Sequence, residues 1–399
     1  MAKIYFEISE DGLARLTGFY EHLHIVSLLN LMKYLRETKV NSKKILFPIY
    51  FPDATRGVVR SLDSVDLKKA KVEGVVINTY HLMTQPGTSV LKDLKGTKRF
   101  MGWDGLIASD SGGFQLLSMI YKNKALGSIS QNGVIFHLDS TGKNKKYVFT
   151  PEKSIEVQFG LDPDIMICLD DCPAQNASPA ENELSVNRTI EWAKRCKEEY
   201  LRQIKKRKMK NDDRPILLAV IQGGHSKKER ERCAKALIDI GFDGYGFGGW
   251  PLDEEGNMDL EILKFTADLM PSNQPKFALG VGNPLAIVEG FKMGYHIFDC
   301  VLPTRDARHQ RLYVFNEDPV KGDILNNKKI HQFIYIARES YVRDSRPVSQ
   351  FCDCHTCQNY SRAYLHHLFV IEDSLAWRLA TIHNLRTYTK LIEVLRKYA

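Results

Sequence analysis

The sequence contains no uninterrupted apolar segment long enough to cross a lipid bilayer. Its first residues lack the basic stretch followed by an apolar run that is typical of a secretory signal. It also has no internal repeat and no low-complexity tract, and no glycine-rich dinucleotide-binding fingerprint follows an early strand. These absences argue against membrane, secreted, repeat and dinucleotide-binding proteins. We therefore expect a cytoplasmic chain folded around its own core.

The chain also lacks a strong excess of charge of one sign. Its 56 Lys and Arg residues against 48 Asp and Glu residues give a formal net charge of +8 over 399 residues. Such a mild excess permits a nucleic-acid partner but does not require one. Hydrophobic residues make up 43% of the sequence, which is enough for a sizeable core and argues against general disorder.

Short apolar segments rich in strand-forming residues recur along the chain and alternate with helical patterns. The segments are residues 74–79, 106–110, 164–170, 216–222, 244–249, 277–282 and 297–302, and the clearest helical patterns cover residues 185–208, 228–240 and 262–269. Near-continuous apolar strands that alternate with helices predict an α/β fold with a parallel sheet buried on both faces. Seven or eight such units in about 250 residues favour a (β/α)8 TIM barrel, with an open doubly wound sheet as the alternative.

The pattern divides the chain into three parts. Residues 61–310 carry the strand–helix units and, we expect, the catalytic site of the barrel. Residues 1–60 fit the pattern poorly and are expected to form a lid of strands with an inserted helix near residues 26–35. Residues 311–399 contain a cysteine cluster followed by helical segments, which predicts a zinc-binding subdomain together with the closing helices of the barrel.

Polar residues stand at the ends of several predicted strands. They are Asp110, Asp170, Gln222 and Asp299, accompanied by glycines at 248, 249 and 280. The active sites of such barrels lie at the carboxyl ends of the strands. Aspartates after strands also commonly cap helices, so each one alone has a structural interpretation. Asp299 is unusual because it lies inside an apolar run, where a desolvated acid needs a reason.

This set of side chains suits chemistry at a sugar carbon. Two acids can act as nucleophile and general acid–base at the C1′ atom, as in retaining glycosyl transfer. A third acid and a carboxamide can bind the donor-rich edge of a guanine-like base. Two glycines follow Ser111 and allow the backbone to approach a flat ligand closely.

A cysteine cluster, Cys352, Cys354 and Cys357, places three thiols within six residues. Such spacing suits a turn wrapped around one tetrahedral zinc ion. The candidates for the fourth ligand are His355, His366, His367 and His383. We favour His383, which lies on a later helix, with His366 as the alternative. Four protein ligands would close the site and make the ion structural.

Two groups of basic residues are candidates for nucleic-acid contacts. The stretch 194–210 is rich in Lys and Arg, and a solvated helix face is its simpler interpretation. Arg305, Arg308 and Arg311 follow Asp299 closely, which makes them the better candidates for contacts with phosphates or unpaired bases.

With these residues, the chain resembles the tRNA-guanine transglycosylases, also called queuine tRNA-ribosyltransferases. The resemblance extends from about residue 45 to 390. Besides the cysteine cluster, it rests on the segments 78–82 (NTYHL), 101–103 (MGW), 109–115 (SDSGGFQ), 150–152 (TPE), 220–224 (VIQGG), 279–282 (LGVG), 298–305 (FDCVLPTR) and 361–367 (SRAYLHH).

The resemblance implies an enzyme that exchanges the wobble guanine of tRNA for a 7-deazaguanine, preQ1 or queuine, in queuosine biosynthesis. Asp299 matches the nucleophile that attacks C1′, and Asp110 matches the general acid–base. The matching base-binding positions are Asp170, Gln222, Gly249, Phe114, Ser111, Trp250 and Leu279. Arg305 and Arg308 match positions that contact the anticodon loop. The resemblance also implies zinc on the three cysteines and His383, no organic cofactor, and usually a homodimer.

Some positions depart from the family pattern and leave the incoming base open. Trp250-Pro251-Leu252 stands where a small apolar pair is common, and Asp171 and Leu279 replace Glu and Met. Pro251 has no N–H, so the peptide before it can accept but cannot donate a hydrogen bond. Two other functions remain as alternatives, the same base exchange on DNA and a non-catalytic tRNA-binding subunit.

Overall fold

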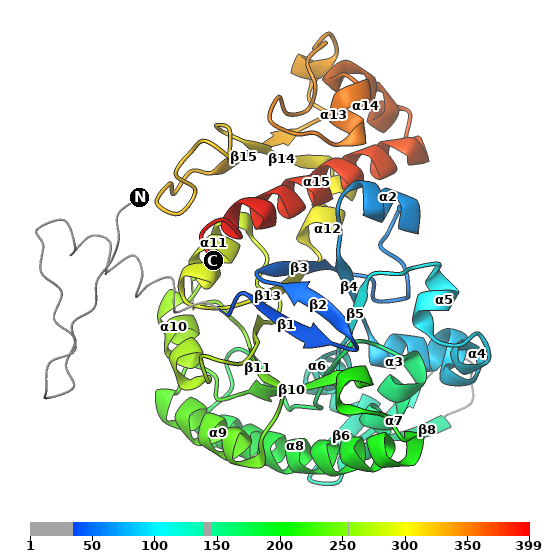
Figure 1. The fold of residues 1–399 in the computed structure, drawn as a ribbon, viewed down its shortest axis with the longest axis vertical. Coiled ribbons are helices and arrows are strands. Elements are labelled where there is room, and N and C mark those ends of the chain that lie inside the picture. Colours follow the sequence, from blue (N-terminus) through cyan, green and yellow to red (C-terminus); the bar gives the residue numbers. More distant parts are fainter. Residues whose placement is uncertain (1–34, 139–144, 254) are drawn as a thin grey trace, which may run out of the picture.

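The computed structural model describes residues 35–138, 145–253 and 255–399, and its largest feature is an eight-stranded parallel sheet (Figure 1). The strands, in their order around the sheet, are β3 (Ile49–Pro52), β13 (Ile297–Cys300), β12 (Lys276–Ala278), β11 (Gly244–Phe247), β10 (Ile216–Ile221), β9 (Ile165–Ile167), β5 (Leu106–Ser109) and β4 (Gly74–Ile77). A parallel bridge between Asp53 and Val76 joins the two ends of this order. The sheet therefore closes into a barrel, which confirms the TIM-like fold and excludes the doubly wound alternative.

Helices surround the barrel. They are α2 (Ser64–Lys69), α3 (Thr79–Leu82), α4 (Thr88–Asp93), α5 (Thr97–Met101), α6 (Gly113–Lys122), α7 (Pro151–Leu161), α8 (Pro179–Arg207), α9 (Lys227–Ile240), α10 (Leu260–Leu269), α11 (Pro284–Lys292) and α12 (Leu302–Arg308). The longest, α8, begins at a capping box in which Ser178 and Glu181 satisfy each other's backbone N–H groups. It ends at Lys208, which has a left-handed backbone conformation. No helix of the described residues combines the length and apolar character needed to span a membrane.

Short elements connect these units. A π-helical turn covers Met83–Gly87, and 3-10 turns cover Lys124–Leu126, Asn211–Asp213 and Glu339–Tyr341. Between α6 and α7 the chain forms a separate antiparallel sheet of β6 (Gly127–Ser130), β7 (Gly133–Leu138) and β8 (Lys145–Phe149).

Alternate residues of the strands fill the barrel interior, as the two-residue period of a strand requires. The packed residues include Ile49, Phe51, Leu106, Ala108, Ile165, Ile167, Ile216, Leu218, Val220, Phe277 and Ile297. At the carboxyl ends of six of the strands, the next position with the same orientation is polar or lines the mouth. These positions are Asp53, Asn78, Asp110, Gln222, Leu279 and Asp299. The two-residue alternation that places apolar side chains in the core thus also places these polar side chains at one end of the barrel.

The N-terminal part of the described chain covers the other end of the barrel. The hairpin of β1 (Glu37–Val40) and β2 (Lys43–Leu46) packs Val40 and Ile45 against the first residues of the barrel strands. The sequence had suggested a lid here and a barrel that starts after residue 60. The structure differs, because β3 is itself a barrel strand paired with β13. The helix expected near residues 26–35 falls almost entirely on residues 1–34, outside the described residues.

A subdomain is formed by residues that follow α12. It contains β14 (Arg311–Phe315), β15 (His331–Tyr335), α13 (His355–Asn359) and α14 (Arg362–Val370). The last helix, α15 (Ser374–Leu395), runs from this subdomain back to the barrel (Figure 1). Its first half packs into the subdomain through Leu379, and its second half packs into the barrel core through Leu391. One helix therefore connects the two hydrophobic cores.

Candidate active site and metal centre

Asp110 stands directly after β5, where backbone and side-chain donors hold its carboxylate. Its Oδ2 atom accepts a hydrogen bond of 2.6 Å from Asn78, and its Oδ1 atom accepts from the N–H groups of Thr79 and Gly112, each at 3.0 Å. Gly112 has a positive φ of 76°, and a Cβ there would lie 2.9 Å from the Tyr80 nitrogen, so glycine is required. Burial, with a smaller contribution from the charge of Asp299, raises the pKa of Asp110 to about 7 despite these hydrogen bonds.

Asp299 lies within β13 and also faces the mouth of the barrel. Its Oδ1 atom accepts a hydrogen bond of 2.8 Å from the Gly280 N–H group, which follows β12. Burial raises the pKa of Asp299 to about 7, and the neighbouring charge of Asp53 acts in the same direction. Two carboxyl groups that titrate near neutral pH therefore face one site. Such a pair can divide the roles of nucleophile and proton carrier.

Asp170 and Gln222 form a second pair beside the two acids. The Gln222 amide donates a hydrogen bond of 2.7 Å to Asp170. Burial raises the pKa of Asp170 to about 6, whereas hydrogen bonds from Gln222 and the Ser111 hydroxyl oppose that shift. A Cβ at Gly248 would lie 2.6 Å from the Gln222 nitrogen, so the turn after β11 needs glycine to pass this side chain.

Gly249 and Trp250, two further predicted base-binding residues, line a pocket with Gln222. Phe114 and Trp250 are partly exposed, and their rings lie 5.5 Å apart at 59°. The Trp250 indole donates a hydrogen bond of 3.1 Å to the Pro173 carbonyl, which fixes the ring over a small pocket lined in part by Gln222 and Gly249. Leu279 packs against the top of the barrel core. These aromatic and aliphatic surfaces can enclose a flat ring.

Three residues that support the site were missed as functional candidates. Asn78 holds Asp110, and Asp53 lies near Asp299. The buried Arg230 donates to the carbonyl groups of Ile221, Gly224 and Gly248 and thereby ties together the turns after β10 and β11. The two-residue alternation could have found Asn78 and Asp53. No sequence pattern indicates the role of Arg230, because its hydrogen-bond partners are backbone carbonyls, which any residue type provides.

The predicted tRNA contacts lie on α12, the helix that follows Asp299. Arg305 is exposed, and Arg308 donates to the Thr304 carbonyl at 2.9 Å. The pKa of Arg308 is lowered by burial and then by the positive charge of Arg60; the charge of Asp53 opposes this shift, and Arg305 adds a smaller lowering effect. Three arginines therefore gather beside the mouth, an arrangement that suits phosphate groups.

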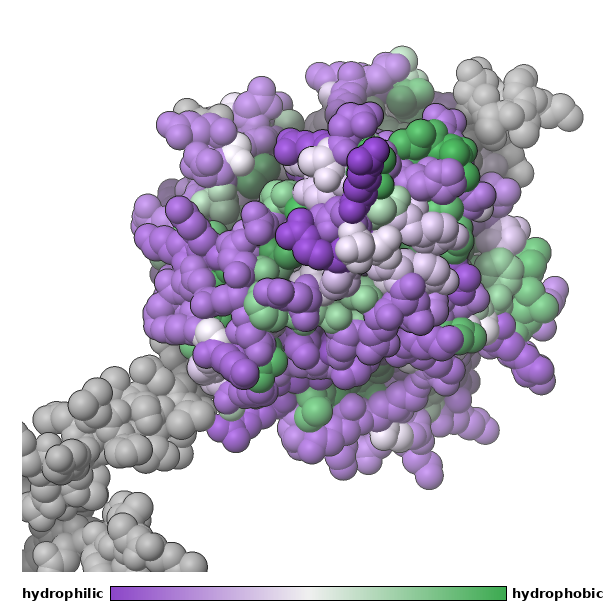
Figure 2. All heavy atoms as spheres, turned by 90° about the horizontal axis from the view of Figure 1, so that it is seen from above, coloured by the Kyte–Doolittle hydropathy of each residue, from purple (hydrophilic) through white to green (hydrophobic). Residues whose placement is uncertain are grey.

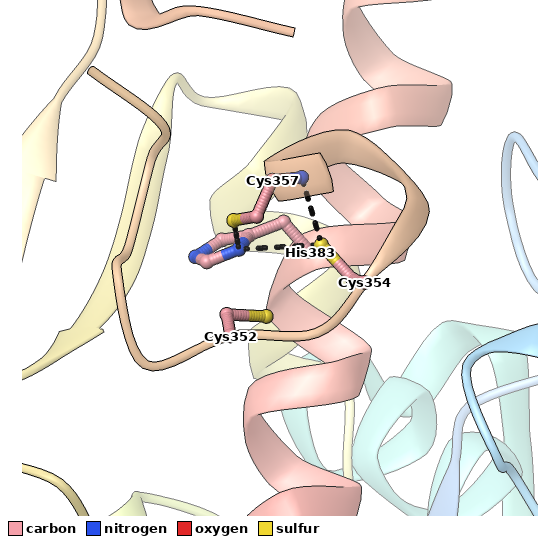
Figure 3. Close-up of side chains that lie close together, drawn as sticks. All are labelled: Cys352, Cys354, Cys357 and His383. Carbon is pink, nitrogen blue, oxygen red and sulfur yellow. Dashed lines mark hydrogen bonds between the residues drawn. The ribbon is translucent and has the colours of Figure 1, made fainter. Parts of the chain in front are cut away.

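The cysteine cluster and His383 meet in the C-terminal subdomain (Figure 3). Their ligand atoms all lie within 4.8 Å of one another. The Nδ1 atom of His383 lies 3.2 Å from the Cys357 sulfur and 3.7 Å from the Cys354 sulfur. Three thiols and one imidazole, close enough to share one tetrahedral ion, are consistent with a structural zinc site.

The second ring nitrogen of His383 supports this arrangement. The Nε2 atom lies 2.7 Å from the Tyr313 carbonyl on β14, which leaves Nδ1 to face the thiols. His366, the alternative fourth ligand, is instead engaged with the Ile336 carbonyl at 2.9 Å. Arg386, three residues after His383 on α15, binds Asp353 of the cysteine loop and fastens the loop to the helix.

Comparisons with known proteins identify the family of this chain. The sequence model of the family described as queuine tRNA-ribosyltransferase matches residues 35–398. The queuine tRNA-ribosyltransferase of Caldanaerobacter subterraneus is 38% identical over 352 residues, which cover 88% of this chain and 85% of that protein. That of Solidesulfovibrio magneticus is 36% identical, with coverages of 88% and 86%. That of Halothermothrix orenii is 36% identical over 370 residues, with coverages of 92% and 90%. The chain therefore belongs to the queuine tRNA-ribosyltransferase family and is a pentosyltransferase.

Proposed function

We propose that this protein exchanges the wobble guanine of tRNA anticodons for a 7-deazaguanine, preQ1 or queuine, in queuosine biosynthesis. The observation that carries the proposal is the pair Asp110 and Asp299, two acids at one barrel mouth whose pKa values are both raised to about 7. A base in an anticodon loop leaves its stack at little energetic cost, so it can enter such a mouth.

The exchange proceeds by double displacement. An oxygen of the ionised Asp299 attacks C1′ of the nucleotide, and the C1′–N9 bond breaks as the new C1′–O bond forms. Asp110 donates its proton to a ring nitrogen of the departing guanine and becomes a carboxylate. Asp110 then accepts the ring proton of the incoming base, whose nitrogen attacks C1′ and releases Asp299. The ester intermediate retains the glycosidic bond energy, so no organic cofactor is required.

The base is read by Asp170 and Gln222 on one edge. The carboxylate accepts from ring and exocyclic N–H groups, and the carboxamide can both accept and donate. Ser111 and Gly249 border this edge, while Phe114, Trp250 and Leu279 cover the faces of the ring. Gly249 and Trp250 line a pocket with Gln222, Phe114 lies against Trp250, and Ser111 hydrogen-bonds to Asp170, which supports this assignment.

A covalent adduct tests the mechanism directly. Incubation with tRNA followed by denaturation should leave a protein–RNA species, and Asp299→Asn should abolish both the adduct and the exchange of labelled guanine. An adduct that persists in Asp299→Asn would refute the assignment. Exchange into duplex DNA but not tRNA would favour the DNA alternative. Absence of any exchange would favour a non-catalytic tRNA-binding subunit, although the retained acids argue against it.

The Trp250–Pro251 peptide bears on the incoming base. Because Pro251 has no N–H, this peptide offers only a carbonyl acceptor, which favours a base with a protonated amine substituent. We infer a preference for preQ1 or queuine over the nitrile preQ0. Parallel exchange assays with each base test this, and faster incorporation of preQ0 than of preQ1 would overturn it.

We further propose one structural zinc ion per chain, a cytoplasmic location with its tRNA substrate, and a homodimer. The dimer is supported by exposed apolar side chains at the end of α14 and on α15, including Val370, Ile371 and Trp377. Figure 2, which views the molecule from the subdomain end, shows several apolar patches on a mostly hydrophilic surface. Sedimentation analysis tests the dimer, and a monomer at micromolar concentration would contradict it.

A further inference from the structure

Asp53 is a further carboxylate at the barrel mouth, and the proposed reaction steps do not use it. It follows β3, in which Ile49 and Phe51 point into the barrel core, so Asp53 occupies the next inward position. Phe51 is the strand partner of Asp299 on β13, and Asp53 itself bridges to Val76 on β4. Asp53 therefore lies beside the proposed nucleophile.

The two oxygens of this carboxylate have different surroundings. The Oδ1 atom accepts hydrogen bonds from the Thr55 N–H group, at 3.1 Å, and from the Thr55 hydroxyl. These contacts fix the orientation of the side chain. The Oδ2 atom has no hydrogen-bond donor within residues 35–138, 145–253 and 255–399. One oriented acceptor is thus left at a partly exposed position in the mouth.

The sheet order places Asp53 on the sugar side of the site. Gln222 follows β10, which lies four strands from β3 in either direction around the barrel. A base bound at Asp170 and Gln222, with its C1′ at Asp299, directs its sugar toward β13 and β3. Phosphates are unsuited to Asp53, because a carboxylate can only accept hydrogen bonds and repels anions. The donor next to C1′ in a ribonucleotide is the 2′-hydroxyl.

We propose that Asp53 is a specificity-determining residue that accepts a hydrogen bond from the 2′-hydroxyl of the target ribose. This inference rests on the proposed function. The 2′-hydroxyl is the group by which a protein distinguishes RNA from DNA at a given nucleotide. Hydrogen bonds to a 2-hydroxyl also strengthen as positive charge develops on the sugar. Asp53 thus contributes both recognition of RNA and stabilisation of the transition state.

The test compares hairpin RNAs that carry guanosine, 2′-deoxyguanosine or 2′-fluoro-2′-deoxyguanosine at the exchanged position. We expect the wild-type kcat/KM to fall about 10- to 100-fold when the hydroxyl is removed, as for a hydrogen bond to a charged group. Asp53→Ala should lose a similar factor on guanosine and little on either modified nucleotide. The ratio between substrates should therefore approach one in the variant.

Thr55→Val is the matched control, since it removes a donor to the opposite oxygen and leaves the Asp53 carboxylate in place. It should retain discrimination against the modified nucleotides. Asp53→Asn, which is nearly isosteric, replaces Asp53→Ala if the latter fails to fold by thermal unfolding, and it should show reduced discrimination. If Asp53→Ala loses the same factor in kcat/KM on all three substrates, the proposal is overturned, and Asp53 only stabilises the loop that contains Thr55. Wild-type enzyme that exchanges no ribonucleotide at all would instead overturn the proposed function itself.

Discussion

The Gln222 amide nitrogen lies 2.7 Å from a carboxylate oxygen of Asp170. The amide oxygen of Gln222 is buried and has no hydrogen-bond partner among the described residues. A buried acceptor without a donor is costly to the folded state. A purine edge rich in N–H groups would satisfy it.

The first prediction concerns this pair. Gln222→Ala should raise the KM for the free base about 10- to 100-fold, because a hydrogen bond in a desolvated site is lost. Steady-state exchange kinetics measure the effect. Gln332→Ala is the control, since that side chain is exposed on β15 of the C-terminal subdomain, away from the barrel mouth. Equal effects of the two substitutions would contradict a base-reading role.

The second prediction concerns the pH dependence of catalysis. Asp299 must be ionised to attack C1′, and its pKa is raised to about 7. The value of kcat/KM should therefore fall as pH decreases through about 7, by about tenfold per unit when one ionisation is required. Asp110 titrates in the same range, so the measured values belong to the pair. A profile that stays flat down to pH 5 would contradict an ionised Asp299 as nucleophile.

A third prediction follows from the stability cost of Asp299. Below about pH 4 its carboxyl is protonated in both the folded and the unfolded chain. Between about pH 4 and 7 the unfolded chain ionises first, so the free energy of unfolding falls as pH rises. The Asn side chain stays neutral at every pH. The free energy of unfolding of Asp299→Asn should therefore exceed that of the wild type by on the order of 2–4 kcal/mol at pH 8, and the two should be equal near pH 4.

Chemical denaturation at both pH values measures this difference. Asp93→Asn serves as the control, because Asp93 is exposed at the end of α4 and its replacement should have little effect at either pH. A gain for Asp299→Asn that is equally large at pH 4 would show that desolvation of the charge is not its cause.

A fourth prediction concerns the metal centre. Purified protein should contain one zinc ion per chain by elemental analysis. Cys354→Ser and His383→Ala should lose zinc and unfold at lower temperature, because the ion joins the cysteine loop to α15. Cys233→Ala removes a buried thiol outside the cluster and should retain the ion. Full zinc content in His383→Ala would point to another fourth ligand.

The fifth prediction concerns RNA binding. Arg305→Ala and Arg308→Ala should raise the KM for tRNA, leave that for the free base unchanged, and reduce the slope of log affinity against log salt by about one. Lys206→Ala, in the last turn of α8, is the matched control for a basic residue outside the mouth. A larger effect of Lys206→Ala would move the RNA-binding surface to α8.

Much of the fold was readable from local patterns. Seven of the eight barrel strands were predicted, because buried parallel strands are nearly continuous apolar runs. The eighth, β3, was assigned to the N-terminal segment, since its four residues precede the first clear strand–helix unit. Its place in the barrel depends on pairing with β13, nearly 250 residues away, which no local pattern encodes.

The sequence by itself determined the chemistry available to this protein: the acids at the strand ends, the three clustered thiols and the family to which they belong. Only the tertiary structure decided which groups act together. It selected His383 over His366, gave the Asp110 and Asp299 carboxyls their raised pKa values by burial, and brought Asp53 beside the nucleophile. The reason is physical, because desolvation and contacts between distant segments exist only once the barrel has closed.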